Sequence, residues 1–199
     1  MLLARKLGKR YGGRIVFRDL EFAVEPGTVA AVVGANGAGK STLLKIIAGL
    51  ARPSVGAVAW INGAGETSNL KWQCGLAAPD APVYRDLTVG ENLEFFAGAR
   101  GGRHDPGALR AHLKSFALDA READLAADLS SGLRARLQLA VATLHAPLIL
   151  LLDEPSANLD AAGRVLLQRV LQEQRARGVA LVATNDPRDV ELCDMSITL

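Results

Sequence analysis

The residues most suited to chemistry are Gly34-Ala35-Asn36-Gly37-Ala38-Gly39-Lys40-Ser41, in which three glycines precede a lysine and a serine. This run fits the P-loop pattern, a glycine and four further residues followed by Gly-Lys-Ser/Thr. Backbone N–H groups can surround an anion only where the chain curls tightly, and Gly34, Gly37 and Gly39 permit that curl. The pattern predicts a loop that binds nucleotide phosphates. The alternative is a Gly/Ala-rich turn without a ligand.

A phosphate loop needs a strand before it and a helix after it, because the helix N-terminus attracts the same anion. Residues 28–33 predict a short buried strand, and residues 41–50 predict a helix. The expected apolar face of that helix consists of Leu43, Leu44, Ile47 and Leu50. Lys40 would reach the β- and γ-phosphates, and the Ser41 hydroxyl would hold Mg²⁺. The predicted nucleotide-binding residues of the loop are Gly34, Asn36, Gly37, Ala38, Gly39, Lys40, Ser41 and Thr42.

A second group of reactive side chains follows a continuously apolar run. Residues 148–152 (Leu-Ile-Leu-Leu-Leu) predict a strand buried on both faces, and Asp153 and Glu154 follow it directly. Carboxylates at such a position must serve a cation or a proton. In a P-loop protein the aspartate holds Mg²⁺, and the second carboxylate can deprotonate a water that attacks the γ-phosphate. The alternative is a pair of acids favoured by a helix dipole.

The rest of the chain supplies the elements that position these residues. Residues 1–25 predict antiparallel strands joined by a turn at Tyr11. An amphipathic helix is expected to end at Gly178, and its apolar residues are Val165, Leu166, Val170 and Leu171. Residues 179–183 predict a strand that ends at Thr184-Asn185-Asp186, at the sheet edge where open α/β folds bind ligands.

We therefore predict an α/β fold of the P-loop NTPase (RecA-like) type, with a parallel-sheet core, an N-terminal antiparallel β subdomain and an inserted helical subdomain. The whole chain, 1–199, is expected to be one domain. Residues 1–79 and 146–199 would form the core, and residues 80–145 the helical part. A capping box at Thr88 and Glu91 predicts one helix start, and Asp105-Pro106 predicts another.

Composition narrows the class of protein. Hydrophobic residues make up 49% of the chain and aromatic residues only 5%, which indicates an aliphatic interior suited to parallel strands between helices. A formal net charge of +2 gives no reason to expect a nucleic-acid partner, which would require a clustered basic face. Cys74 and Cys193 match no metal or redox spacing, so we expect both to be reduced.

Together the motifs resemble those of the nucleotide-binding domain of ATP-binding cassette (ABC) proteins, and the resemblance covers essentially the whole chain. Residues 129–132 (Leu-Ser-Ser-Gly) match the family's Leu-Ser-Gly-Gly-Gln signature, with Ser131 in place of the first glycine and Leu133 in place of the glutamine. Tyr11 matches its aromatic A-loop. Residues 156–160 match the D-loop. Asp153 and Glu154 match the Walker B aspartate and the catalytic glutamate.

In this family two domains pair head to tail, and ATP at one P-loop is covered by the partner's signature helix. The resemblance thus implies that Ser130, Ser131 and Gly132 contact ATP in the other protomer. A serine-rich turn is also an ordinary helix N-cap, and that alternative stays open from the residues alone. Tyr11 would stack on the nucleobase, or else pack on its own hairpin.

Two positions depart from the family pattern. The Q-loop glutamine should fall near Pro79 or Asp80, and neither is glutamine. The switch histidine is expected after Thr184, where the chain has Asn185, which can donate a hydrogen bond but cannot carry a proton. We expect ATP binding to be intact and hydrolysis to be slowed, because such donors can each change the rate by about 10²- to 10³-fold.

The resemblance implies a subunit that hydrolyses Mg-ATP at a dimer interface, most simply a homodimer, and drives an integral membrane permease. It would lie at the cytoplasmic face of the cell membrane through that partner. The cofactors are ATP and Mg²⁺. The predicted catalytic residues are Lys40, Glu154 and Asn185, and the predicted metal ligands are Ser41, Asp80 and Asp153.

Within the family, the short chain, the variable Q-loop and residues 87–93 (Leu-Thr-Val-Gly-Glu-Asn-Leu) resemble the ATP-binding subunit of the cytochrome c maturation haem exporter. Many drug and peptide exporters share these features. A second class is a nucleotide-binding switch that hydrolyses ATP slowly or not at all, as the missing glutamine and histidine would suggest. Family members that act in DNA repair or on ribosomes usually carry a second cassette or a long coiled coil, and neither occurs in these 199 residues.

Overall fold

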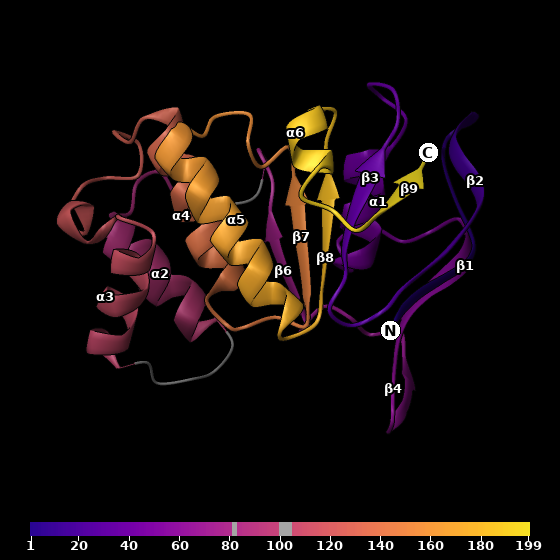
Figure 1. The fold of residues 1–199 in the computed structure, drawn as a ribbon, viewed down its shortest axis with the longest axis horizontal. Coiled ribbons are helices and arrows are strands. Elements are labelled where there is room, and N and C mark those ends of the chain that lie inside the picture. The colour runs from indigo at the N-terminus through magenta and orange to yellow at the C-terminus, as the bar shows by residue number, and fades with distance from the viewer. Residues whose placement is uncertain (81–82, 100–104) are drawn as a thin grey trace.

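The computed structural model describes residues 1–80, 83–99 and 105–199, and in this part nine strands form two sheets (Figure 1). The strands are β1 (Leu2–Tyr11), β2 (Arg14–Val24), β3 (Val29–Val33), β4 (Val55–Asn62), β5 (Gly65–Thr67), β6 (Cys74–Ala77), β7 (Ile149–Asp153), β8 (Val179–Ala183) and β9 (Met195–Thr198). The helices are α1 (Lys40–Ile47), α2 (Val89–Gly98), α3 (Pro106–Ser115), α4 (Ser131–Thr143), α5 (Ala161–Arg175) and α6 (Pro187–Val190), with a 3-10 helix, η1 (Asp119–Arg121), between α3 and α4.

The larger sheet is parallel and has the strand order β6-β7-β8-β3-β9. Strands β7 and β8 are buried along their whole length, as their continuous apolar runs predict. Because β3, β7 and β8 run in the same direction, they end at one edge of the sheet (Figure 1). The P-loop, Asp153-Glu154 and Thr184-Asn185 follow these three strands and therefore meet at that edge.

The N-terminal strands form a second, antiparallel sheet with the order β2-β1-β4-β5. β1 pairs with β2 from Leu2 opposite Val24 to Tyr11 opposite Arg14, so a tight turn joins the two strands. β4 and β5 form the short hairpin that Asn62-Gly63 predicts. The predicted α/β fold, with a parallel core and an N-terminal antiparallel part, is confirmed.

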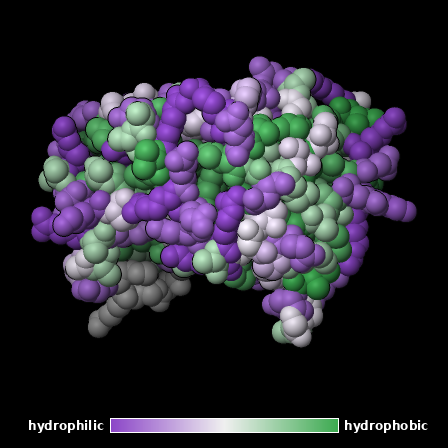
Figure 2. All heavy atoms as spheres, viewed as in Figure 1, coloured by the Kyte–Doolittle hydropathy of each residue, from purple (hydrophilic) through white to green (hydrophobic). Residues whose placement is uncertain are grey.

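Two hydrophobic cores lie on the two faces of the parallel sheet, because successive side chains of a strand point to opposite faces. Ile149 and Leu151 of β7 pack in the core with α1 and the antiparallel sheet. Leu150 and Leu152 pack in the other core with α4 and α5. Hydrophilic residues are prominent where α5 crosses the viewed surface, opposite the side of that helix that faces the core (Figures 1 and 2).

Between β6 and β7 the described residues form α2, α3, η1 and α4. The Thr88–Glu91 capping box is present at the start of α2, and Asp105 caps α3, which begins with Pro106. Residues 81–82 and 100–104, which belong to the predicted helical stretch 80–145, lie outside the described residues. No helix in the described ranges is long and apolar enough to cross a membrane.

Two residues assigned to buried helix faces are exposed. Leu50 is 62% exposed, because α1 ends before Gly49, whose φ of 72° turns the chain away. Val165 is 66% exposed, whereas Leu167 is buried. The buried positions of α5 recur at the i, i+3, i+4 spacing of one helix face, from Gly163 to Gln174, and Val165 lies off that face.

Strand β6 was not predicted from the sequence, because a strand of four residues carries little pattern. Gly178 was expected to end the preceding helix, but its role is different. Helix α5 ends at Arg175, and a Cβ on Gly178 would lie 2.0 Å from the Leu148 carbonyl oxygen. Gly178 therefore permits a close approach between the segments that lead into β7 and β8.

Candidate nucleotide-binding site

The P-loop connects β3 to α1 and leaves the start of the helix open. Gly37 and Gly39 have φ values of 80° and 107°, in the region that favours glycine. A Cβ on Gly39 would lie 2.4 Å from Cγ1 of Val16, so the loop is also pressed against β2. No side chain caps the N-terminus of α1. Its first N–H groups are therefore available to an anion.

Lys40 is held in place between the P-loop and the end of β8. It is 7% exposed, and its Nζ donates hydrogen bonds to the Gly34 carbonyl oxygen at 2.9 Å and to Asn185 Oδ1 at 3.0 Å. Asn185 Nδ2 in turn donates to Asn36 Oδ1 at 2.6 Å. Three of the predicted site residues thus form one hydrogen-bonded chain. An incoming phosphate would take over one or both Lys40 bonds.

Asp153 and Glu154 stand where β7 ends. Asp153 is 8% exposed, and Glu154 has a φ of 48°, in the left-handed region that a non-glycine residue rarely adopts. The Glu154 N–H donates to the Ala183 carbonyl oxygen at 2.8 Å, which fixes this conformation against β8. Such a conformation costs about 1–3 kcal/mol and is often found where a side chain must point in one functional direction.

A buried carboxylate that sequence reasoning missed lies behind Glu154. Asp189 of α6 is 4% exposed, and its Oδ2 accepts hydrogen bonds from Ser156 Oγ at 2.8 Å and Thr184 Oγ1 at 3.0 Å. The same Thr184 hydroxyl lies 3.4 Å from Glu154 Oε2. Asp189 therefore joins the segments after β7 and β8. Nothing in the local sequence distinguishes it from other acids near the C-terminus.

A cleft of about 500 Å³ gathers many of the predicted residues from three parts of the chain, but Gly34, Ala38 and Asn185 are not in its lining. It is lined by Tyr11, Arg14, Val16, Asn36, Gly37, Gly39, Lys40, Ser41, Thr42, Asp153 and Glu154. Its hydroxyl and carboxylate oxygens suit Mg²⁺, a hard cation. Nowhere in the described ranges do three His, Cys, Asp or Glu residues group as a metal site. Mg²⁺ usually binds proteins through one or two carboxylates and takes its other ligands from phosphates and water.

Tyr11 is at the rim of this cleft and is 55% exposed. The Lys9 Nζ lies 4.4 Å from the centre of its ring and also donates to the Arg52 carbonyl oxygen at 2.7 Å. The ring therefore borders the cleft and is also supported by its own hairpin. Packing on its own hairpin is observed, and stacking on a nucleobase stays a prediction.

Asp80 is not among the residues that line the cleft. It accepts a hydrogen bond from the Lys45 Nζ at 2.6 Å, and this bond raises the pKa of Lys45. Desolvation opposes that increase, while the charges of Asp80 and Asp153 reinforce it. The structure therefore directs Asp80 to α1 rather than to the predicted metal site. Its role as a metal ligand stays a prediction that the geometry does not support.

The signature residues lie at the N-terminus of α4, outside the cleft of their own chain. Ser130 caps α4, and its Oγ accepts the Leu133 N–H at 3.3 Å. A Cβ on Gly132 would lie 3.0 Å from the Asn158 carbonyl oxygen, which places the signature turn beside residues 156–160. The N-cap alternative is thus correct in geometry. The expected contact between these residues and the ATP of a second protomer stays a prediction.

A family described as "ABC transporter" matches residues 17–157, which include the P-loop, the signature turn and Asp153-Glu154. This chain belongs to that family. The prediction of an ABC nucleotide-binding domain, a domain of the ATPase type, is confirmed. The ABC fold explains why the cleft lies at one edge of a parallel sheet, with a separate antiparallel sheet beside it.

Two relatives share the name "aliphatic sulfonates import ATP-binding protein SsuB". The protein from Burkholderia thailandensis is 36% identical over 194 residues, 95% of this chain and 55% of its own length. The protein from Rhodococcus jostii is 38% identical over 197 residues, 97% of this chain and 76% of its own length. The chain spans little more than half the length of several such relatives. Neither name supports the haem-exporter assignment.

One solved structure of similar fold is titled "Structure of ATP binding subunit of ABC transporter". Its sequence is 28% identical, and the two structures match with a TM-score of 0.85 over all of this chain and 85% of that one. A second is a dimeric ATP-binding cassette in a post-hydrolysis state bound to ADP and phosphate. It has a TM-score of 0.86 over all of this chain and 94% of that one. At 22% identity the second comparison shows the fold alone.

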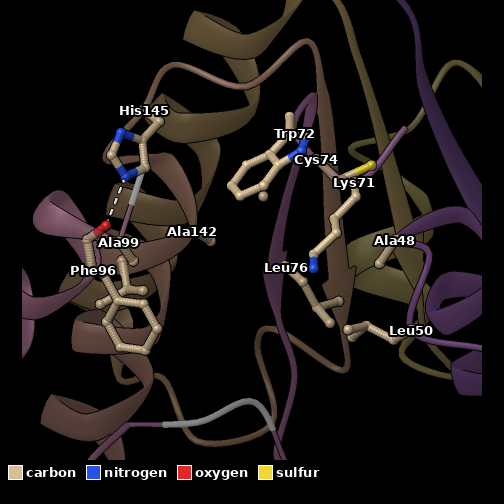
Figure 3. A pocket seen from close by; sticks show the side chains of 12 residues that line it. Ala48, Leu50, Lys71, Trp72, Cys74, Leu76, Phe96, Ala99, Ala142 and His145 are labelled. Carbon is tan, nitrogen blue, oxygen red and sulfur yellow. Dashed lines mark hydrogen bonds between the residues drawn. The ribbon is translucent and has the colours of Figure 1, made fainter. Parts of the chain in front are cut away.

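A second cavity has a volume of about 410 Å³. Its walls come from the segment after α1, the segment that leads into β6, β6 itself, and the C-terminal ends of α2 and α4, and they are mostly apolar. Trp72, 58% exposed, lies beside Cys74 and Lys71, whereas Phe96 and Leu50 lie farther away in the lining (Figure 3). His145 closes one end, where its Nε2 lies 2.9 Å from the Phe96 carbonyl oxygen (Figure 3). None of the cleft residues lines this cavity.

Proposed function

We propose that this chain is the ATP-hydrolysing subunit of an ABC transporter. The observation that carries the proposal is the cleft, which Lys40 and Ser41 of the P-loop line together with Asp153 and Glu154 at the end of β7. One wall binds phosphate, and the other offers a metal ligand and a base. The relatives named as transport subunits support this function over a nucleotide switch without a transport role.

In the proposed reaction, the open N-terminus of α1 and Lys40 bind the phosphates of ATP. Ser41 and Asp153 would hold Mg²⁺, which neutralises charge on the β- and γ-phosphates. Glu154 accepts a proton from a water as the water oxygen bonds to the γ-phosphorus and the bond to the β-phosphate oxygen breaks. ADP and phosphate are the products. Asn185 would hydrogen-bond the γ-phosphate as the Lys40 bond is released.

The second half of the proposed site comes from another copy of the chain. Ser130, Ser131 and Gly132 are not among the residues that line the cleft of their own protomer, and they lie at the N-terminus of the 13-residue helix α4. A helix N-terminus favours an anion. We infer that two chains pair head to tail, so that each α4 N-terminus closes over the ATP of the other. The similarity to a dimeric cassette supports this pairing only at the level of fold.

The proposed transport partner is an integral membrane permease, reached from the cytoplasmic face. We place its contact at the apolar cavity around Trp72, whose rim carries the cationic Lys71. That lining suits an apolar helical segment bearing an acidic residue. The names of the relatives favour import over export, and a sulfonate is the substrate that those names suggest.

Nucleotide titration tests the site. Lys40→Ala should weaken Mg-ATP binding about 10- to 100-fold, because a charge-assisted hydrogen bond of about 1.5–3 kcal/mol is lost. Lys45→Ala, on the same helix but paired with Asp80, should bind ATP like the wild-type chain. Equal affinities for both variants would contradict the assignment of the cleft.

Membrane fractionation tests the partner surface. When the chain is produced together with its permease, Trp72→Glu should release it from the membrane fraction without changing ATP affinity. Val165→Glu places the same charge on an exposed apolar residue of α5 and serves as the control. If both variants stay with the membrane, the cavity is not the contact.

A further inference from the structure

A small cavity of about 30 Å³ lies beside the same two carboxylates that line the ATP cleft. Asp153 and Glu154 border both spaces. The polar side chains at the small cavity, besides those two acids, belong to Gln138 of α4 and Asn158. Pro79, from the segment after β6, contributes a wall without a hydrogen-bonding side chain. The cavity therefore joins the proposed base to a carboxamide from α4.

Gln138 is held at this cavity by one hydrogen bond. Its Nε2 donates to the Ala78 carbonyl oxygen at 2.8 Å, across 60 positions of the sequence. Among the hydrogen bonds of the described residues, none uses its Oε1. Because the two ends of a carboxamide point in different directions, fixing Nε2 on Ala78 leaves Oε1 as an oriented acceptor.

The cavity has the size and chemistry of a water site. A single water requires about 10–15 Å³ and two to four polar partners, and this space offers more than that volume. A carboxylate and a carboxamide oxygen both accept hydrogen bonds. A water that donates one hydrogen to Glu154 and the other to Gln138 would keep its lone pairs free for attack.

We propose that Gln138 orients the hydrolytic water beside Glu154. This inference rests on the proposed function, since it requires Glu154 to act as the base. The water oxygen bonds to the γ-phosphorus, one of its protons passes to Glu154, and the bond to the leaving ADP breaks. The hydrogen directed at Gln138 stays with the phosphate product. Gln138 thus supplies a carboxamide in a space where position 79 has proline.

Steady-state hydrolysis of Mg-ATP by four variants tests this role. Gln138→Leu removes the carboxamide at similar volume and should lower kcat about 10- to 100-fold, with KM for ATP within about twofold. Gln168→Leu changes an exposed glutamine of α5 and should leave both constants unchanged. Pro79→Gln in the Gln138→Leu background returns a carboxamide from the opposite wall. It should recover at least about fivefold of the lost rate.

The outcomes separate the two proposals. If Gln138→Leu matches Gln168→Leu while Glu154→Gln abolishes turnover, the water-orienting role is wrong and the proposed function stands. A lower kcat with a raised KM, without recovery by Pro79→Gln, would mean that Gln138 only ties α4 to β6, and would overturn the inference. Absence of any Glu154-dependent turnover in the wild-type chain would overturn the proposed function, and this inference with it.

Discussion

Replacing Asp189 should destabilise the fold through two hydroxyls at once. Both Ser156 Oγ and Thr184 Oγ1 donate to the same oxygen, Asp189 Oδ2, and all three residues are at most 5% exposed. Asp189→Ala leaves the Ser156 hydroxyl buried and unpaired, at a cost of about 1–3 kcal/mol, and it leaves the Thr184 hydroxyl only the longer bond of 3.4 Å to Glu154 Oε2. The loss of a buried charge offsets part of that cost. We expect the free energy of unfolding to fall by about 2–5 kcal/mol.

Asp189→Asn provides the sharper comparison, because a single carboxamide oxygen can replace Oδ2 and keep both bonds. We expect a loss of about 1 kcal/mol or less for this variant. Glu191→Ala, at an exposed acid at the end of α6, should stay within about 0.5 kcal/mol of wild type. Urea unfolding followed by circular dichroism measures all three. If Asp189→Ala loses no more than Glu191→Ala, the network does not hold these segments together.

Two further predictions concern packing and pH. Gly75→Ala should lower the free energy of unfolding in urea by at least about 1–3 kcal/mol, because the new Cβ would lie 1.9 Å from the Ala142 carbonyl oxygen. The control, Gly63→Ala, places its Cβ in open space and should be neutral. Equal stability of the two variants would mean that α4 lies farther from β6. Burial lowers the pKa of His112 below its ordinary 6.5, so the unfolded chain binds the proton more readily and stability should fall as pH drops through about 6.5. His112→Gln should flatten that slope between pH 7.5 and 5.5, and an unchanged slope would exclude His112 as its source.

The core of the site could be predicted from the sequence because two local patterns and one rule of topology determine it. Glycine spacing indicates the P-loop, and the apolar run before Asp153 indicates a buried strand. Parallel strands bring their carboxyl ends to one edge, so Glu154 and Lys40 had to lie near each other. The structure places both at one cleft.

The remaining contacts depend on packing between distant segments, which no local pattern encodes. Asp189 meets Ser156 across 33 positions, and Gln138 meets Ala78 across 60. Asp80 was assigned to the metal from its place in the chain, but α1 presents Lys45 to it at 2.6 Å. The exposure of Leu50 depends on where α1 ends, and helix ends are less certain than helix cores.

The central claim is that Glu154 carries ATP hydrolysis in this cleft, and phosphate release by purified Glu154→Gln beside wild type tests it most directly. We expect wild-type turnover to fall about 10²- to 10⁴-fold, with Mg-ATP affinity unchanged and ATP-bound dimers accumulating. Glu173→Gln, at an exposed acid of α5, should keep wild-type turnover. No turnover by the wild-type chain despite Mg-ATP binding, or equal turnover by wild type and Glu154→Gln, would contradict the claim.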